Sequence, residues 1–158
     1  MATHGARLLR YWRRLRPVPG GRHLFSWIVG RAAPYTGSIR PLIAELEPGR
    51  CVVVMRDRRG LRNHLRSIHA IALANLGEVA SGLALVTALP DGMRGIPTAL
   101  RVDYRKKARG RLEATGTADR PTPPTGENVE HDVEASMHEA EGDLVAEVRV
   151  TWRIGSTS

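Results

Sequence analysis

Residues 68–89 form an unusually apolar stretch, which contains one acidic residue, Glu78, and no Lys, Arg or Asp. The stretch is rich in Ala, Leu and Gly, and its length suits a helix. A helix without a polar face must be buried on all sides, in a protein core or in a membrane. The amide, hydroxyl and carboxyl side chains within it make a lone membrane span the weaker alternative. We therefore expect a central, enveloped helix, capped by Ser67 and stopped at residues 89–92.

The rest of the chain is dominated by segments in which apolar and polar residues alternate. This period of two predicts antiparallel strands with one buried and one solvated face. We expect strands near residues 38–46, 50–56, 100–105, 111–115, 129–138 and 144–154. A sheet with one apolar face and a helix that is apolar all round have one obvious arrangement, in which the sheet curls around the helix. The sequence predicts an α+β domain of this kind over residues 22–158.

Residues 1–21 form a basic leader. Residues 1–44, which include this leader, carry eight arginines and no Asp or Glu, so the whole net charge of +8 lies within residues 1–44. Two short helices are expected, over 6–16 and 22–31. The first is amphipathic: it could contact an anionic membrane surface or ligand phosphates, or simply pack on the domain with its arginines in water. We favour the packed arrangement.

Composition excludes several classes of protein. Beyond residue 44 the 16 basic and 16 acidic residues balance, and no basic stripe is interleaved with aromatic residues, so no nucleic-acid partner is expected. The one cysteine, Cys51, lies in an apolar run, which favours a buried side chain over a nucleophile. Without a secretory h-region or a cysteine pair, we expect a cytoplasmic protein.

Glu78 is the strongest candidate for chemistry. An enveloped carboxylate is costly, and burial raises its pKa toward the range useful for a general base. The alternative is a structural glutamate bonded to the backbone, Asn75 or Ser81. At the start of the same helix, the amides of Ala70 and Ile71 could stabilise an oxyanion. The histidines His64 and His69 lack a metal-ligand spacing, so no metal site is expected.

Residues 63–78 carry a family resemblance. The pattern Asn63-x5-His69-Ala70-x7-Glu78 resembles the signature of hotdog-fold thioesterases of the phenylacetyl-CoA type. The wider chain, including residues 30–35 and 104–110, resembles an uncharacterised thioesterase-like branch of that superfamily. The resemblance covers about residues 22–155 and implies a hotdog fold.

The resemblance also implies roles. Glu78 would activate a water or attack an acyl-CoA thioester directly, Asn63 would orient the substrate or water, and His69 would open the helix that carries the oxyanion amides of Ala70 or Ile71. Because the acid and the oxyanion hole commonly come from different subunits in this family, a homodimer or a dimer of dimers is implied. The family's glycines are replaced here by Ala70 and Ile71, whose Cβ atoms narrow the approach to the amides.

The substrate would be an acyl-CoA or acyl-carrier thioester, with coenzyme A present only as part of the substrate and no resident cofactor. We expect four residues to contact it: His64, Lys106, Lys107 and Arg109. A solvated turn is the alternative for the basic residues among them. Two other functions stay open: a non-catalytic hotdog protein that binds acyl groups or acyl carriers, and an adaptor built on the basic leader.

Overall fold

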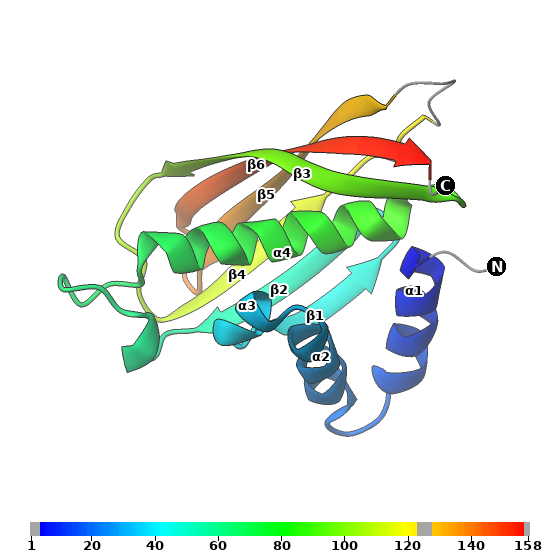
Figure 1. The fold of residues 1–158 in the computed structure, drawn as a ribbon. Coiled ribbons are helices and arrows are strands. Elements are labelled where there is room, and N and C mark those ends of the chain that lie inside the picture. The colour runs from blue at the N-terminus through cyan, green and yellow to red at the C-terminus, as the bar shows by residue number, and fades with distance from the viewer. Residues whose placement is uncertain (1–3, 123–127, 157–158) are drawn as a thin grey trace.

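The computed structural model describes residues 4–122 and 128–156 and has an α+β architecture (Figure 1). The sheet contains β1 (Leu42–Glu47), β2 (Arg50–Arg56), β3 (Met93–Tyr104), β4 (Arg111–Thr117), β5 (Val129–Glu139) and β6 (Leu144–Ser156). All pairings are antiparallel, in the order β1-β2-β4-β5-β6-β3. The helices are α1 (His4–Leu15), α2 (Gly21–Ala32), α3 (Pro34–Ser38) and α4 (Ala70–Ala88), with a single turn η1 (Arg59–Leu61) before α4.

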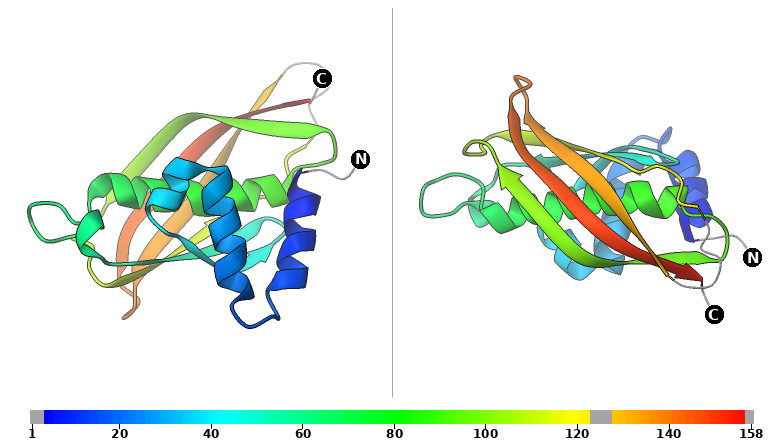
Figure 2. Two further views of the ribbon diagram at one scale, coloured as in Figure 1. Left: turned by 60° about the horizontal axis from the view of Figure 1, so that its bottom comes forward. Right: turned by 90° about the horizontal axis from the view of Figure 1, so that it is seen from above.

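The sheet curves around α4, as the sequence predicts (Figure 2). The inward side chains of β6, such as Val148, Val150 and Ile154, are buried against the helix, while the outward ones face solvent. Gly116 on β4 allows the close approach of helix and sheet, because a Cβ there would overlap the Ala80 carbonyl. Of the described helices, α4 alone is long and apolar enough to span a membrane, and 67% of that segment is buried in the fold. It is therefore a core helix.

The N-terminal helices cover the side of α4 that the sheet leaves open. Helix α1 packs on α4, and Gly5 sits so close to the Val86 carbonyl that a side chain would not fit. The apolar side of α1 is buried through Leu9 and Trp12, and the Trp12 ring contacts Phe25 of α2 with centroids 5.2 Å apart. The packed arrangement favoured for this helix is the one observed.

Several element boundaries differ from those expected. Strand β1 begins at Leu42 rather than near residue 38, because Ser38 belongs to the short helix α3. Pro34 begins the short helix α3 rather than only ending α2, because proline is well suited to the first position of a helix. Strand β3 starts at Met93, several residues early; it lies at the sheet edge, where Pro97 and a bulge between Pro97 and Ala99 are tolerated. Helix α4 is capped by His69, not by Ser67, whose hydroxyl instead donates to Asn63.

Candidate functional site

Glu78 lies in the middle of α4 and borders a pocket that Trp152 of β6 also lines. Burial raises the pKa of its carboxyl above the usual value. The neighbours expected to bind it do not: the Asn75 amide donates to the Tyr35 carbonyl (3.1 Å), and the Ser81 hydroxyl donates to the Glu78 backbone carbonyl (3.2 Å). Among the described residues, none donates a hydrogen bond to the Glu78 carboxylate. The alternative of a structural glutamate, held by the backbone, Asn75 or Ser81, therefore has no hydrogen bond to support it among the described residues.

Glu78 borders a small pocket of about 180 Å³. Its walls are mostly apolar and come from α1, α2, α3, α4 and β6, with Leu8, Val29, Leu83 and Trp152 among them. An engineered apolar cavity of about 150 Å³ holds a benzene molecule. The pocket beside the acid therefore has the size of a short acyl group or one aromatic ring.

Asn63 organises the loop before α4. Its Oδ1 atom accepts hydrogen bonds from the Leu65 amide (2.9 Å), the Ser67 amide (3.3 Å) and the Ser67 hydroxyl (3.1 Å). The loop is fastened further where the Ile68 amide donates to the Ala108 carbonyl (2.9 Å). With its oxygen engaged, Asn63 has only its side-chain NH₂ group left to offer a substrate.

The start of α4 is built by His69. Its Nδ1 atom accepts a hydrogen bond from the Ile71 amide at 3.1 Å, so one of the two amides expected to form an oxyanion hole is already bound. The Ala70 amide has no hydrogen-bond partner within the described part of the chain. The Tyr104 hydroxyl donates to the Ala70 carbonyl at 3.0 Å, and burial raises the pKa of Tyr104. The free donor at the helix start is thus the Ala70 amide.

The acid and the free amide do not meet within one chain. Glu78 follows Ala70 by eight residues, and at 1.5 Å per residue this separates them by roughly 12 Å along α4. A thioester carbonyl held at Ala70 is therefore out of reach of Glu78 of the same molecule. These two groups can act on one substrate only if two copies of the chain combine.

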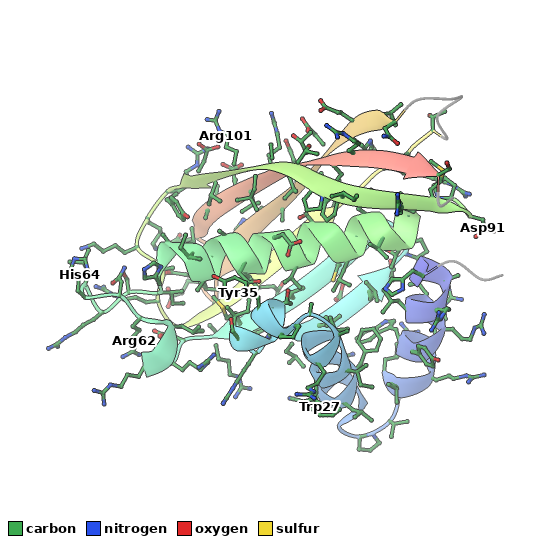
Figure 3. All side chains as sticks on the ribbon, in the orientation of Figure 1. Trp27, Tyr35, Arg62, His64, Asp91 and Arg101 are labelled. Atoms are coloured by element: carbon green, nitrogen blue, oxygen red, sulfur yellow. The ribbon has the colours of Figure 1, made fainter. Side chains whose placement is uncertain are left out.

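The residues expected to contact the substrate lie at the same end of the molecule as the start of α4. His64 is exposed at the tip of the loop before the helix (Figure 3). Lys106 is engaged in ion pairs with Glu139 (2.9 Å) and Asp143 (2.8 Å). The side chains of Lys107 and Arg109 are exposed and form no ion pair with a described residue. Lys107 and Arg109 are therefore the better donors for an anionic group.

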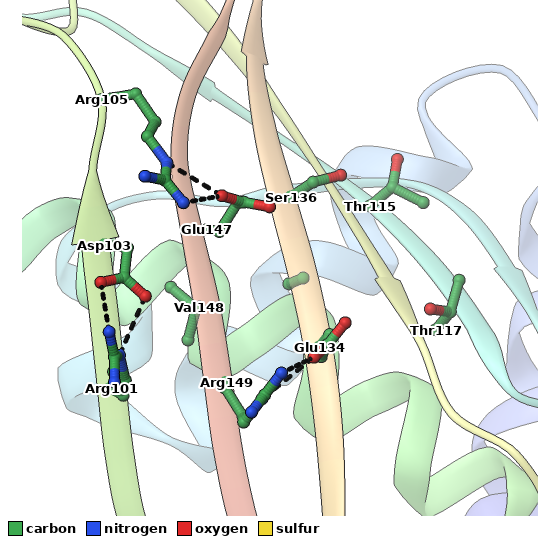
Figure 4. A pocket seen from close by; sticks show the side chains of 11 residues that line it. Arg101, Asp103, Arg105, Thr115, Thr117, Glu134, Ser136, Glu147, Val148 and Arg149 are labelled. Carbon is green, nitrogen blue, oxygen red and sulfur yellow. Dashed lines mark hydrogen bonds and ion pairs between the residues drawn. The ribbon is translucent and has the colours of Figure 1, made fainter.

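A larger hollow lies on the outer face of the sheet and differs in character from the pocket at Glu78. Its charged side chains neutralise one another: Arg101 pairs with Asp103 (3.0 Å), Arg105 with Glu147, and Arg149 with Glu134 (Figure 4). This hollow has a volume of about 430 Å³ and an open, solvated surface. Since its charges are already paired and exposed, we assign it no chemistry.

The Cys51 thiol and the metal-binding side chain types offer no second candidate site among the described residues. Burial raises the pKa of the Cys51 thiol to about 12, so this cysteine is not a nucleophile. Within residues 4–122 and 128–156, no three His, Cys, Asp or Glu side chains gather closely enough to hold a metal ion.

Sequence reasoning missed the contributions of Tyr104 and of the pocket walls in α1, α2 and α3. Tyr104 opens the segment 104–110 that carries part of the family resemblance, and this was its only signal. The pocket walls left no trace in the sequence, because apolar residues on α1 and α2 look the same whether they line a pocket or fill a core.

Comparison with solved structures identifies the fold. A structural-genomics target, APC5556, matches with a TM-score of 0.81 at 29% identity, over 96% of this chain and 100% of the other. The Pseudomonas aeruginosa protein PA5026, described as a probable thioesterase, matches with a TM-score of 0.72 at 23% identity over 89% and 97% of the two chains. The Haemophilus influenzae thioesterase HI1161 matches with a TM-score of 0.65 at 14% identity over 77% and 82%.

These matches confirm the expected hotdog fold and the resemblance to thioesterases that share it. Among curated proteins, none matches the chain. The family model described as "Domain of unknown function (DUF4442)" matches residues 21–154, which is most of the chain. The protein therefore belongs to the DUF4442 family and has the fold of the hotdog thioesterases.

Proposed function

We propose that this protein hydrolyses acyl-CoA thioesters, with Glu78 as its catalytic base or nucleophile. The observation that carries the proposal is the Glu78 carboxylate: it is half-buried, has a raised pKa, lacks a hydrogen-bond donor among the described residues and borders an apolar pocket. The description of similar folds as thioesterases supports the same reaction class. The size of the pocket favours short or aromatic acyl groups.

The reaction follows from these groups. Glu78 takes a proton from a water molecule, whose oxygen attacks the thioester carbonyl; alternatively the carboxylate attacks directly and water hydrolyses the resulting anhydride. The oxyanion is stabilised by the Ala70 amide of the partner subunit at the positive end of its helix. The C–S bond then breaks, and coenzyme A leaves as a thiol after taking up a proton. Coenzyme A enters only with the substrate.

The exposed edge of the sheet supports a dimer. Within the described residues, β3 pairs only with β6, so its other edge offers a long row of unpaired backbone groups. Leu100 and Tyr104 on the side of β3 that faces α4 are 44% and 47% exposed, and Ile71 on α4 is also exposed. Antiparallel pairing of two β3 strands would cover these side chains and bring the start of one α4 toward the other copy.

Thiol release from short, medium, long and aromatic acyl-CoAs, measured with a thiol reagent, tests the proposal. We expect turnover by the wild type and a loss of about 10²- to 10⁴-fold in Glu78→Gln. Glu130→Gln is the matched control, because Glu130 is exposed on β5. The buried Cys51 adds no background signal. Equal turnover in wild type and Glu78→Gln would refute the assigned role.

A second function is favoured by one observation. The Ile71 amide is held by His69, and positions 70 and 71 carry side chains where the family signature has glycines. A protein with this geometry could bind an acyl group without cleaving it. Saturable binding of acyl-CoA by both wild type and Glu78→Gln, with no thiol release by either, would establish this alternative.

A further inference from the structure

The outer face of α2 is apolar, and the described residues of the chain leave it exposed to solvent. Leu24, Trp27 and Ile28 lie at positions i, i+3 and i+4, so they form one stripe on the helix. Their exposed fractions are 47%, 63% and 46%. The opposite face of α2 is the one used for packing, through Phe25. This helix is therefore apolar on two sides, of which only one is buried by the fold.

The surroundings of this stripe are basic. All eight arginines of residues 1–44 are exposed, and none forms an ion pair with a described residue. Arg16, in the loop that joins α1 to α2, and Arg22 and Arg31 on α2 lie nearest the stripe in the sequence. No Asp or Glu precedes Glu45, so no acidic side chain of this segment offsets their charge.

A hollow of about 550 Å³ lies beside Trp27, between α2, α3 and the start of β1. His23, Arg31 and Arg40 border it together with the apolar side chains of Pro34 and Leu42, and none of its lining residues is acidic. This combination suits an anionic head group with an apolar portion beside it.

We propose that the α1–α2 hairpin docks on an anionic lipid bilayer, with Leu24, Trp27 and Ile28 at the boundary between head groups and acyl chains. A stripe of bulky apolar residues flanked by arginines is the pattern of helices that lie in the membrane interface, and tryptophan prefers that depth. The arginines match the charge of anionic lipids. An acidic protein would satisfy the arginines but gives no reason for the exposed apolar stripe beside them.

The position of the hairpin is compatible with this role in a dimer. The hairpin and β3 lie on opposite sides of α4 (Figure 1). Pairing through β3 would leave α2 free to face a membrane. The inference does not depend on the proposed hydrolysis, since its evidence lies in residues that do not touch Glu78.

Vesicle binding tests the proposal directly. Of the three tryptophans, Trp12 and Trp152 are buried, so intrinsic fluorescence changes at an interface report Trp27. The probe is a set of vesicles of phosphatidylcholine with or without phosphatidylglycerol, in low and high salt. We expect co-sedimentation and a blue shift with the anionic vesicles only, both weakened by salt. Trp27→Phe should still sediment but lose the blue shift.

The double variant Trp27→Ser/Ile28→Ser should bind anionic vesicles at least tenfold more weakly, with an unchanged circular dichroism spectrum. Leu65→Ser is the matched control, because Leu65 is an exposed leucine in the loop before α4, away from α2, and should bind as the wild type does. Wild-type protein that ignores anionic vesicles, or a double variant that binds them as well as the wild type, would overturn the proposal. So would wild-type protein that binds an acidic carrier protein but no vesicle.

Discussion

At the scale of a single residue, Glu78 opposes the stability of the fold that contains it. Its folded-state pKa is raised by burial, so the native protein holds this proton more tightly than the unfolded chain does. Below the ordinary glutamate pKa of about 4.3 both states are protonated and burial costs little. As the pH rises from there through the raised pKa, ionisation in the buried site lowers the free energy of unfolding.

This sign gives a prediction for Glu78→Gln, whose amide cannot ionise. The variant should be more stable than the wild type at pH 7, and the difference should vanish toward pH 3.5. Urea unfolding midpoints of both proteins at the two pH values measure it, with Glu130→Gln as a control that should follow the wild type. A wild type that is more stable than Glu78→Gln at pH 7 would mean that the carboxylate has a stabilising partner.

At the scale of one element, the chemical role of the Ala70 amide at the start of α4 can be tested without disturbing the helix. Ala70 is the first residue of the helix, where proline is favoured because its missing N–H has no partner in the helix. His69 already has the extended backbone that a following proline requires (φ −64°, ψ 139°). Ala70→Pro therefore deletes the proposed oxyanion donor and should leave the fold intact.

We expect Ala70→Pro to lower the rate of thioester hydrolysis by about 10²- to 10³-fold, the typical effect of removing one oxyanion donor. Its thermal unfolding midpoint should stay close to that of the wild type. Ala70→Ser, which keeps the amide, is the control and should stay active. Full activity in the proline variant would exclude the Ala70 amide from the site.

The elements also show how far the sequence reaches. Residues 68–89 could be recognised as a core helix because no other soluble arrangement accepts a segment without a polar face. The strands β5 and β6 could be predicted from the strict alternation of apolar and polar residues. The first half of β3 could not be predicted, because this edge strand carries Pro97 and exposed residues such as Ile96 that break the pattern. The capping of α4 by His69 could not be predicted from the sequence either, because serine is by far the more usual N-cap residue.

At the scale of the whole molecule, the sequence located Glu78 and the helix start, and the family resemblance implied that the two groups come from different subunits. It did not show that the Ile71 amide is already bound by His69. The pocket walls could not be predicted either, since they depend on how α1 and α2 pack across α4. The spacing of eight residues corresponds to roughly 12 Å of helix, and the structure adds that α4 is one unbroken helix from Ala70 to Ala88. Because the two groups of one chain are too far apart to act on one thioester, the proposed site requires two copies of the chain.

A mixing experiment answers that question. Homodimers of Glu78→Gln lack the acid at both sites, and homodimers of Ala70→Pro lack the amide at both. If each site takes its acid from one chain and its amide from the other, a mixed dimer contains one site with both groups and one with neither. Mixing the two inactive variants after reversible dissociation should therefore restore up to about a quarter of the wild-type activity, because half of the dimers are mixed and each has one of two sites intact.

The unmixed variants, and a mixture of Glu78→Gln with Glu78→Asn, are the controls and should stay inactive. Leu100→Arg on the exposed edge of β3 should abolish the recovery by preventing dimer formation, which light scattering after size exclusion would show as a monomer. If mixing restores nothing although mixed dimers form, the acid and the amide do not serve one site across the dimer. The oxyanion donor would then have to be a group close to Glu78 in the same chain, and not the Ala70 amide.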